Sequence, residues 1–425
     1  MTTHPVLREV QISDYEKVKS LFRKIRMPSE SIEAWKSYRK SPALKKAGKD
    51  FPFGWVLESG NNIVGYLANI PMMYSYQGSE VFVAVARAYA VAPEYKGHGL
   101  KLALKFFKQQ EVSALLNTTA NEYSAAVFKY FNAKPVPQAH YNEALFLVFN
   151  SWQFLRAVFL KCKFPGAIAS GAALLNTTAN EHSAAVFKYL KAKPVPQAHY
   201  NEVLFLVYNS WQFLRAVFIK CKFPGSIASG TALFLAPLFK IITILKQKNT
   251  PSYLQDLFLK RVCIDNLVEE LDKLWVTKRE QRVFYTDRSV AMLQWRINIA
   301  PSLYHMYGAY LKGQFLGYIL LKIEHVEHLK LKRCLIIDIF GDFKNDENLE
   351  VLISKLVREV QNLSVDTLEI IGFPQAIREV VKRLLPFKRI IPTWPYFKFM
   401  TQDLRTVCQN SDFWYVSLID GDSSL

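Results

Sequence analysis

Cysteine is scarce in this 425-residue sequence, which has five cysteines and no Cys-x-x-Cys pair. A disulfide framework and a cysteine-built zinc site are therefore not expected, and we predict no other metal site. Charged residues interrupt the N-terminal segment before an apolar run can form, so no cleavable signal peptide is expected. Together these features predict a cytoplasmic protein.

Disorder does not fit the composition either, because 50% of the residues are hydrophobic and only 21% are charged. A chain of this length and composition is expected to form two folded domains, with room for a third unit.

Acidic residues are fewer than basic ones: the sequence has 36 Asp and Glu and 54 Lys and Arg, which gives a net charge of +18. Eleven of the basic residues fall between Lys17 and Lys49. This density suits an anionic ligand, an anionic membrane surface or RNA, although a solvated pair of helices has the same composition. No DNA partner is expected.

One apolar stretch, residues 223–245, is long enough to span a bilayer. Pro237 and Lys240 within it favour a buried or interfacial hairpin instead. Amphipathic helices are expected to begin at Trp152 and Trp211, and such helices lie on a membrane surface or pack between domains. With the basic segment, they raise the hypothesis of peripheral attachment to the inner face of an anionic membrane.

Residues 113–171 and 172–230 are two copies of one 59-residue segment, identical at 51 positions. Each copy reads as strand, helix, Pro-broken loop, strand and amphipathic helix. Solenoid repeats are shorter and more numerous, so we interpret the pair as a partial duplication with one copy surplus to the fold. We expect the first copy to complete the first domain's sheet, because its strand at residues 114–121 follows the preceding helix after a short connection.

One turn in the N-terminal half carries a chemical signal. A strand expected at residues 80–91 leads through the sequence VAPEYKGHGLK into a helix. This order places several backbone N–H groups around one point, an arrangement that binds a pyrophosphate, and Lys96 and Lys101 add positive charge. Glycines there let the backbone approach the phosphates, although glycine pairs at such junctions often only make the turn. The expected apolar stripe of the helix is Leu100, Ala103, Leu104 and Phe107.

The order of elements, the turn VAPEYKGHGL and the next strand, which ends at Asn121, resemble the GNAT superfamily of N-acetyltransferases over about residues 7–150. In that family the turn, typically Arg/Gln-x-x-Gly-x-Gly/Ala, binds the pyrophosphate of acetyl-CoA, so the resemblance implies acetyl-CoA as co-substrate. Lys101 departs from the family's small residue. The resemblance assigns cofactor binding to Lys96, Gly97, His98, Gly99, Leu100 and Lys101 in the turn, to Val91 and Ala92 along the pantetheine arm, and to Asn121 and Phe128 beyond it.

Catalytic groups are harder to assign. Many enzymes of the family carry a tyrosine seven residues after the asparagine, and this sequence has Phe128 there. Phenylalanine cannot protonate the leaving thiolate, so we expect water or Tyr89 to do so, with positioning of amine and thioester supplying most of the rate. Glu58 and Glu80 are candidate bases on residue type, although each is also a typical surface glutamate.

The second half repeats the element order of the first: strands at 304–311, 314–324 and 332–339, a helix at 348–362, a strand at 367–371 and a helix at 375–385. We therefore predict an α/β (α+β) fold of two GNAT-like domains, each a mixed, mostly antiparallel sheet flanked by helices. In place of the phosphate-binding turn stands FGDFKNDE, whose three acidic residues would repel a pyrophosphate.

The predicted units are an acyl-CoA-binding domain (1–150), a second repeat copy (172–230), an apolar helix and linker (231–250), and a second domain without the turn (251–425).

These features predict an N-acetyltransferase that moves an acetyl group from acetyl-CoA to an unidentified amine acceptor, with the second domain shaping the acceptor site. Paired domains of this kind also resemble bacterial acyltransferases of surface polysaccharide or peptidoglycan chemistry, which implies a cell-surface saccharide or peptide precursor as acceptor. Two alternatives stay open: a Fem-type aminoacyl-tRNA-dependent transferase that uses its basic face for tRNA, and a catalytically degenerate GNAT-like binding module.

Overall fold

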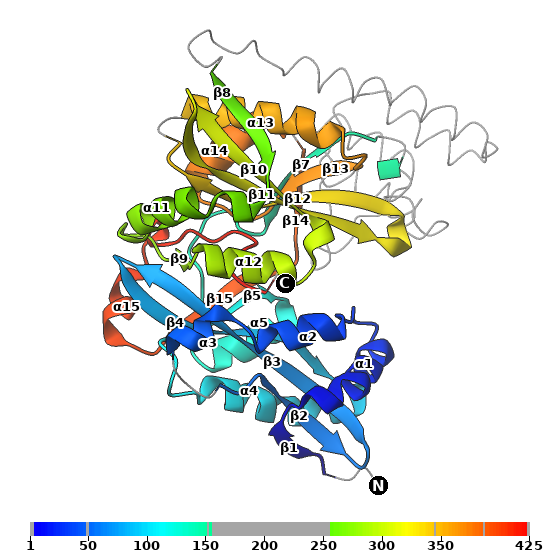
Figure 1. Cartoon of the computed structure of the whole chain (residues 1–425). Coiled ribbons are helices and arrows are strands. Elements are labelled where there is room, and N and C mark those ends of the chain that lie inside the picture. The colour runs from blue at the N-terminus through cyan, green and yellow to red at the C-terminus, as the bar shows by residue number, and fades with distance from the viewer. Residues whose placement is uncertain are drawn as a thin grey trace, which may run out of the picture.

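The computed structural model describes residues 4–47, 51–150, 153–154, 256–343, 346–385 and 387–422. Two mixed sheets, each flanked by helices, form the two halves of the molecule (Figure 1). The second repeat copy, the linker, the helices expected from Trp152 and Trp211 and the stretch 223–245 fall outside the described residues. Within the described part of the chain, no helix is long and apolar enough to cross a membrane.

The first sheet has the strand order β1-β2-β3-β4-β5-β15-β6, and a short strand, β9, pairs with β3. Its only parallel pair in the described chain is β4–β5. The longest strand, β3, is buried along nearly its whole length, as expected for a strand covered on both faces. The strands are β1 (Val6–Glu9), β2 (Gly54–Ser59), β3 (Asn62–Tyr76), β4 (Ser79–Val91), β5 (Ala114–Ala120), β6 (Lys134–Pro135), β9 (Tyr285–Thr286) and β15 (Trp394–Phe399).

Helices cover both faces of this sheet. Neighbouring residues of a strand point to opposite faces of the sheet, so the contacts of two adjacent β3 residues show which helices cover which face. Tyr66 packs on Phe22 and Trp35, whereas a Cβ at Gly65 would meet Leu102. One face is therefore covered by α1 (Tyr15–Lys24) and α2 (Ile32–Tyr38), with α3 (Pro42–Ala47) next along the chain, and the other by α4 (Gly99–Phe107), beside which α5 (Glu122–Tyr130) packs.

The apolar stripe expected on α4 is partly wrong. The helix buries Leu102, Ala103, Phe106 and Phe107, while Leu100 and Leu104 are 44% and 40% exposed. The buried face lies one position before the expected stripe, because Leu102 packs on Gly65 of β3 and Phe106 on Phe128 of α5.

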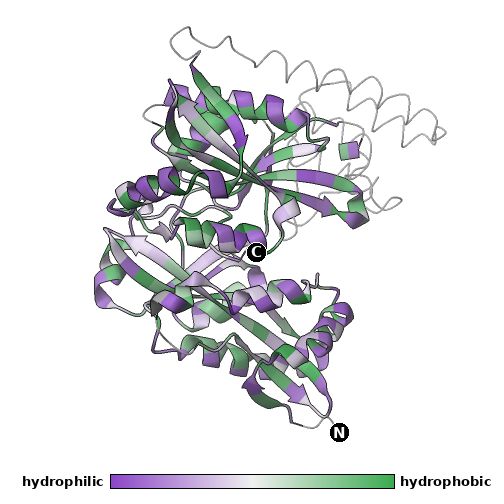
Figure 2. Cartoon of the chain, viewed as in Figure 1, coloured by the Kyte–Doolittle hydropathy of each residue, from purple (hydrophilic) through white to green (hydrophobic). Residues whose placement is uncertain are grey.

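The second sheet repeats this plan with the order β14-β7-β13-β12-β11-β10-β8, and its only parallel pair among described strands is β12–β13. The elements are β7 (Glu143–Val148), β8 (Leu257–Val262), β10 (Tyr304–Leu311), β11 (Gln314–Val326), β12 (Leu331–Gly341), β13 (Thr367–Ile370), β14 (Phe387–Ile390), α11 (Val268–Arg279), α12 (Val290–Asn298), α13 (Asp346–Gln361) and α14 (Gln375–Leu384). The last helix, α15 (Gln402–Val407), lies beside β15 of the first sheet (Figure 1). The helices of the second sheet alternate hydrophilic and hydrophobic residues, as expected for helices with one face on a sheet (Figure 2). The predicted α/β fold of two similar domains is confirmed.

The two sheets exchange strands. The strand β7 belongs to the first repeat copy, yet it pairs with β13 and β14 of the second sheet. In return β15, close to the C-terminus, pairs with β5 and β6 of the first sheet. The sheets therefore do not divide at residue 150, and the first copy supplies β5 and β6 to the first sheet and β7 to the second.

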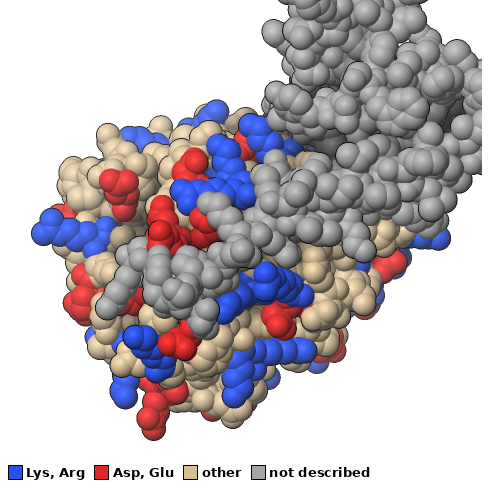
Figure 3. Space-filling model, turned by 90° about the horizontal axis from the view of Figure 1, so that it is seen from above, with Lys and Arg blue, Asp and Glu red and all other residues tan. Residues whose placement is uncertain are grey.

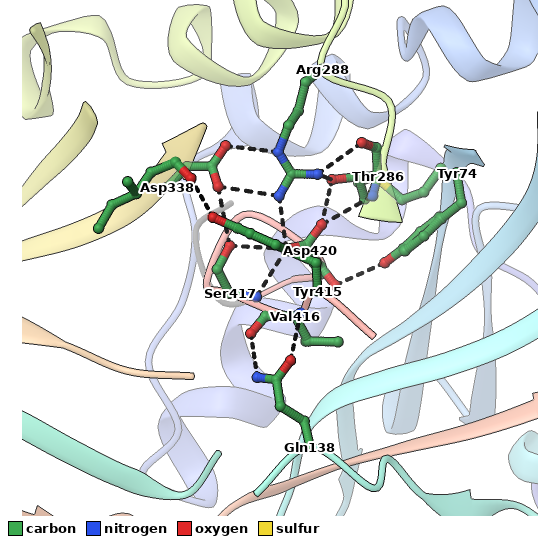
Figure 4. Close-up of polar contacts among 12 residues, drawn as sticks. Tyr74, Gln138, Thr286, Arg288, Asp338, Tyr415, Val416, Ser417 and Asp420 are labelled. Carbon is green, nitrogen blue, oxygen red and sulfur yellow. Dashed lines mark hydrogen bonds and ion pairs between the residues drawn. The ribbon is translucent and has the colours of Figure 1, made fainter. Parts of the chain in front are cut away.

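The C-terminal segment joins the halves. Arg288 is fully buried and donates to both Asp338 (Nε to Oδ2, 2.8 Å) and Asp420 (Nη2 to Oδ2, 3.0 Å). Asp420 also accepts from Thr286 and Ser417, and its carbonyl accepts from the Tyr74 hydroxyl of the first sheet (Figure 4). This buried network fixes the last described residues of the chain between the two sheets.

Candidate functional site

A gap opens between the two parallel strands of the first sheet. They pair over three residues, from Val83 opposite Ala114 to Val85 opposite Leu116, and no pairing between them continues beyond this point. The remaining part of β4 therefore presents an unpaired edge toward β5. Ala92 donates its N–H to Val64 on the β3 side, so strand alternation turns the N–H and C=O of Val91 toward the gap.

A bulge in β4 turns side chains to both faces of the gap. Ala88 has a positive φ of 56°, and the register with β3 shifts opposite this point, between Tyr66 and Ala68. An inserted residue reverses the alternation of a strand. Arg87 consequently points to the α2 face, where it binds Glu30, whereas Tyr89 points to the α4 face and lies against Gly99.

The turn that follows β4 is a short 3-10 helix, Pro93–His98, which leads directly into α4. Its two glycines differ. A Cβ at Gly99 would lie 2.7 Å from the Tyr89 hydroxyl and 3.1 Å from Val91, so packing within the protein explains this glycine. A Cβ at Gly97 would meet nothing within 4 Å, and neither glycine has a positive φ. No neighbour in the described chain requires glycine at position 97, and the backbone there is open to close approach.

Positive charge surrounds the start of α4. Lys96, Leu100 and Lys101 are exposed, and the first turn of the helix contains no acidic residue that would offset its dipole. His98 is half-buried and packs edge-on against His4, with ring centroids 5.7 Å apart. The one carboxylate of the preceding turn, Glu94, is paired with Lys24. The arrangement can bind a phosphate or pyrophosphate.

The two expected positions on α5 have structural partners. Asn121 is the N-cap of α5, and its side chain accepts from the Ser124 N–H at 3.0 Å. Phe128 is 3% exposed and packs among Phe106, Phe107 and Tyr396. It therefore lies in the core, away from the edge of β4.

The three expected catalytic residues lie apart. Glu58 accepts from Arg8 at 2.7 Å and from Lys17 at 3.3 Å, and the Arg8 hydrogen bond holds its pKa below the usual value. Glu80 lies at the opposite end of β4 from the turn, next to Ser75 of β3. Only Tyr89 lies at the gap, and burial raises the pKa of its hydroxyl, which favours the protonated form.

On the α2 face, the end of the chain contributes to the gap. The Asp422 carboxylate accepts from Thr118 (2.6 Å) and Thr119 (3.0 Å) of β5, and it lies 3.6 Å from the Arg87 guanidinium of β4. Arg87 is also paired with Glu30, which accepts from the Tyr38 hydroxyl at 2.7 Å. Burial lowers the pKa of Arg87, but Tyr38, Glu30 and Asp422 outweigh this effect and raise it overall, so Arg87 is a permanent cation.

Sequence reasoning did not identify these residues. Asp422 lies 304 positions from Thr118, and no local pattern marks either one. A partial signal was available at Thr118 and Thr119, two polar residues that end an apolar strand.

The second sheet has a comparable gap with different chemistry. Its parallel pair ends at Ile336 opposite Ile370. Beyond it lies a cavity of about 260 Å³, whose wall includes Phe340, Asp342, Asp346 and Lys278. The wall of this cavity thus combines aromatic and aliphatic side chains with two carboxylates and one lysine.

No family model matches the sequence, and no curated protein matches it. A solved structure of N-myristoyltransferase from Saccharomyces cerevisiae with bound myristoyl-CoA is similar, with a TM-score of 0.50, 9% identity, and coverage of 93% of this chain and 79% of that one. The chain has a two-domain GNAT fold. A probable N-acyltransferase from Enterococcus faecalis V583 (TM-score 0.49, 9% identity, 93% and 72% coverage) and a GCN5-related N-acetyltransferase from Anabaena variabilis (0.47, 12%, 93% and 73%) also match. The similarity to the N-myristoyltransferase structure confirms the predicted fold of two GNAT-like domains.

Proposed function

We propose that this GNAT-fold protein is an N-acetyltransferase that transfers the acetyl group of acetyl-CoA to an amine. One observation carries the proposal: an unpaired strand edge at Val91 leads directly to a helix N-terminus through Gly97, a glycine with free space around it. An amide-containing arm can add to such an edge as an extra strand, and a pyrophosphate suits the turn beyond it. The pantetheine and pyrophosphate of a CoA thioester have these two chemistries in this order.

In this proposal the turn from Lys96 to Lys101 binds the pyrophosphate through backbone N–H groups and the two lysines. Val91 pairs with the pantetheine arm, and Ala92 keeps this part of β4 bound to β3. The thioester then lies near the bulge of β4. Asn121 and Phe128 act indirectly, the first by starting α5 and the second by packing α5 on α4.

The amine approaches from the α2 face, where Glu30 and Asp422 attract its ammonium form. After loss of a proton to water, the nitrogen attacks the thioester carbonyl. The C–N bond forms, the nitrogen gives its second proton to water, and the C–S bond breaks. The thiolate takes a proton from water, or from Tyr89, which then regains one from water. Because Glu58 and Glu80 lie away from the gap, most of the rate must come from holding amine and thioester together.

Thermal unfolding with and without acetyl-CoA tests the proposal. A ligand that binds only the folded state raises the melting temperature, by an amount that grows with its concentration above Kd. We expect acetyl-CoA to stabilise the wild-type protein and Gly97→Glu to abolish this effect, because the change adds bulk and negative charge where the phosphates bind.

Two controls separate ligand loss from misfolding. Gly97→Ala should fold normally, since its added Cβ meets nothing within 4 Å. Lys382→Glu changes charge at an exposed position on α14, where the side chain is 63% exposed, and should keep the full acetyl-CoA effect. Unchanged stabilisation of Gly97→Glu would refute the assignment of the turn.

The same assay distinguishes the alternatives. Stabilisation by tRNA with a steep salt dependence, and none by acetyl-CoA, would favour a Fem-type enzyme. Absence of both effects would favour a degenerate binding module. A stronger effect of long-chain acyl-CoA than of acetyl-CoA would keep the acyltransferase and change its donor.

A further inference from the structure

Exposed apolar side chains gather on two neighbouring helices of the first domain. Nine large hydrophobic side chains are exposed in the described part of the chain, and four of them are on α4 and α5. Their exposed fractions are high for apolar residues on such short helices: 44% for Leu100, 40% for Leu104, 77% for Tyr123 and 70% for Tyr130.

These four side chains, together with Phe131, belong to a single apolar strip. On α4, Leu100 and Leu104 are one turn apart, on the flank of the helix that also carries Phe107. Phe107 stacks on Phe131 just beyond α5, with ring centroids 4.5 Å apart, and Phe131 contacts Tyr130 at 5.2 Å. Tyr123, seven residues before Tyr130, lies two turns away on the same side of α5. We call Leu100, Leu104, Tyr123, Tyr130 and Phe131 the α4–α5 strip.

The charged side chains next to the strip on α4 are all lysines. Residues 96–108 contain Lys96, Lys101, Lys105 and Lys108, all exposed, and no Asp or Glu. The second domain is different: α13 carries both signs of charge, and the face seen from above in Figure 3 mixes Lys and Arg with Asp and Glu. The α4–α5 strip is therefore bordered by lysines alone on α4, while α5 adds Lys129 and one exposed carboxylate, Glu122, so that the charge around the strip is predominantly positive.

The basic segment 17–49, which first suggested a membrane surface, is a weaker candidate. Its helices α1 and α2 lie on the opposite face of the sheet, and Ser37 of α2 accepts from Trp295 of the second domain. Lys17 and Lys24 are already paired with Glu58 and Glu94. The lysines of α4 have no ion pair among the described residues.

We propose that the α4–α5 strip docks the protein on an anionic lipid bilayer. Tyrosine and leucine side chains insert shallowly at a membrane interface, while long lysine side chains reach the lipid phosphates around them. Lysine side chains near such a surface are attracted by its negative potential. Charge complementarity thus selects an anionic bilayer as the occupant, and the proposal does not depend on the transferase reaction.

Vesicle flotation with the full-length protein tests this proposal. We expect flotation with phosphatidylcholine vesicles containing 30% phosphatidylserine and little with pure phosphatidylcholine, with binding falling as salt rises. Leu104→Glu combined with Tyr130→Glu, and separately Lys105→Glu combined with Lys108→Glu, should each weaken vesicle binding about tenfold or more, by loss of insertion and by charge reversal.

Matched variants on the second domain control for charge and hydrophobicity. Val276→Glu replaces an apolar side chain on α11 that is 54% exposed, and Lys382→Glu reverses an exposed lysine on α14. Both should float like the wild type. Thermal unfolding must show that all variants are folded.

Equal flotation of the strip variants and the wild type would overturn the proposal and point to another part of the chain. Absence of flotation by the wild-type protein at low salt would overturn it as well. Stabilisation by acetyl-CoA, measured on the same samples, reports separately on the proposed function, because none of the four replaced residues belongs to the turn.

Discussion

The two halves of the protein share a topology and differ first at the end of the strand that opens the parallel pair. In the first half this end is a turn with Lys96, Lys101 and an unobstructed Gly97. In the second half it is an acidic segment beside a cavity of about 260 Å³, lined partly by Asp342 and Asp346. The fold supplies a diverging strand pair twice, and the residues that follow it decide which ligand each half can accept.

A second difference lies in what fixes each gap. Beside the second gap, Asp338 of β12 is held by the buried Arg288. At the first gap, Arg87 of β4 is held by Glu30 and by Asp422 from the chain's end. Both gaps thus use a carboxylate from the C-terminal segment. At the second gap Asp420 joins Asp338 of the strand on one fully buried arginine, whereas at the first gap Asp422 pairs with the arginine of the strand itself. Three sets of variants test this comparison.

The largest effect is expected from Arg288→Met. Removing one partner of a buried ion network leaves the carboxylates of Asp338 and Asp420 unpaired, at a cost of about 3–5 kcal/mol. Urea unfolding should show this loss in stability.

Arg383→Met is the matched control, because the Arg383 side chain is 51% exposed in its 2.8 Å pair with Glu350. Exposed pairs contribute at most about 1 kcal/mol. Similar losses for the two variants would mean that the Arg288 network does not join the halves as described.

Local patterns predicted most of the individual elements. The strands β10 and β13 and the helix α14 begin at the residues expected from apolar runs and turn signals. The exchange of β7 and β15 could not be predicted, because their partners lie more than two hundred residues away in the sequence and strand propensity does not specify a partner. The expectation that residues 1–150 form one unit relied on chain order, which this exchange does not follow.

Only the part of the site formed by consecutive residues could be predicted from the sequence. The turn from Lys96 to Lys101 is continuous in sequence, so its glycines and charges could be recognised. Arg87 and Asp422 come together through the C-terminal segment, and no spacing rule connects them. Phe128 was assigned to the cofactor through the family pattern, and its burial of all but 3% reflects a core position that an amphipathic pattern on α5 could have indicated.

An effect of intermediate size on stability is expected for one of two paired carboxylates, Glu369 in the second half, and a smaller one for Glu58 in the first. Glu369 is buried between Arg333 (2.7 Å) and Arg389 (2.9 Å), and although burial opposes ionisation, the two guanidinium groups hold its pKa far below the usual value. Glu58 has the same kind of partners in a half-exposed setting. At pH 7, Glu369→Gln should cost about 2 kcal/mol, as expected for buried hydrogen bonds to charged groups, and Glu58→Gln less than about 1 kcal/mol.

The pH dependence has a definite sign. A carboxylate whose pKa is depressed in the folded state stabilises the protein above the pKa of the unfolded state, about 4.3 for Glu, and loses this contribution as pH falls below it. The stability difference between wild type and Glu369→Gln should therefore shrink from pH 5 downward. A difference that stays constant to pH 2 would show that Gln disturbs packing rather than charge.

The smallest effect is expected from charge reversals at the ends of the two strands, measured as a change in acetyl-CoA affinity. Lys101→Glu reverses a charge at the N-terminus of α4, while Lys278→Glu reverses one beside the cavity of the second half, where Lys278 lies 3.7 Å from Asp342. If only the first gap binds a CoA thioester, Lys101→Glu should weaken acetyl-CoA binding about tenfold, or about 1.4 kcal/mol, and Lys278→Glu should leave it unchanged. Titration calorimetry with acetyl-CoA measures both. Equal weakening by the two variants would mean that overall charge attracts the ligand, and weakening by Lys278→Glu alone would move the CoA site to the second half.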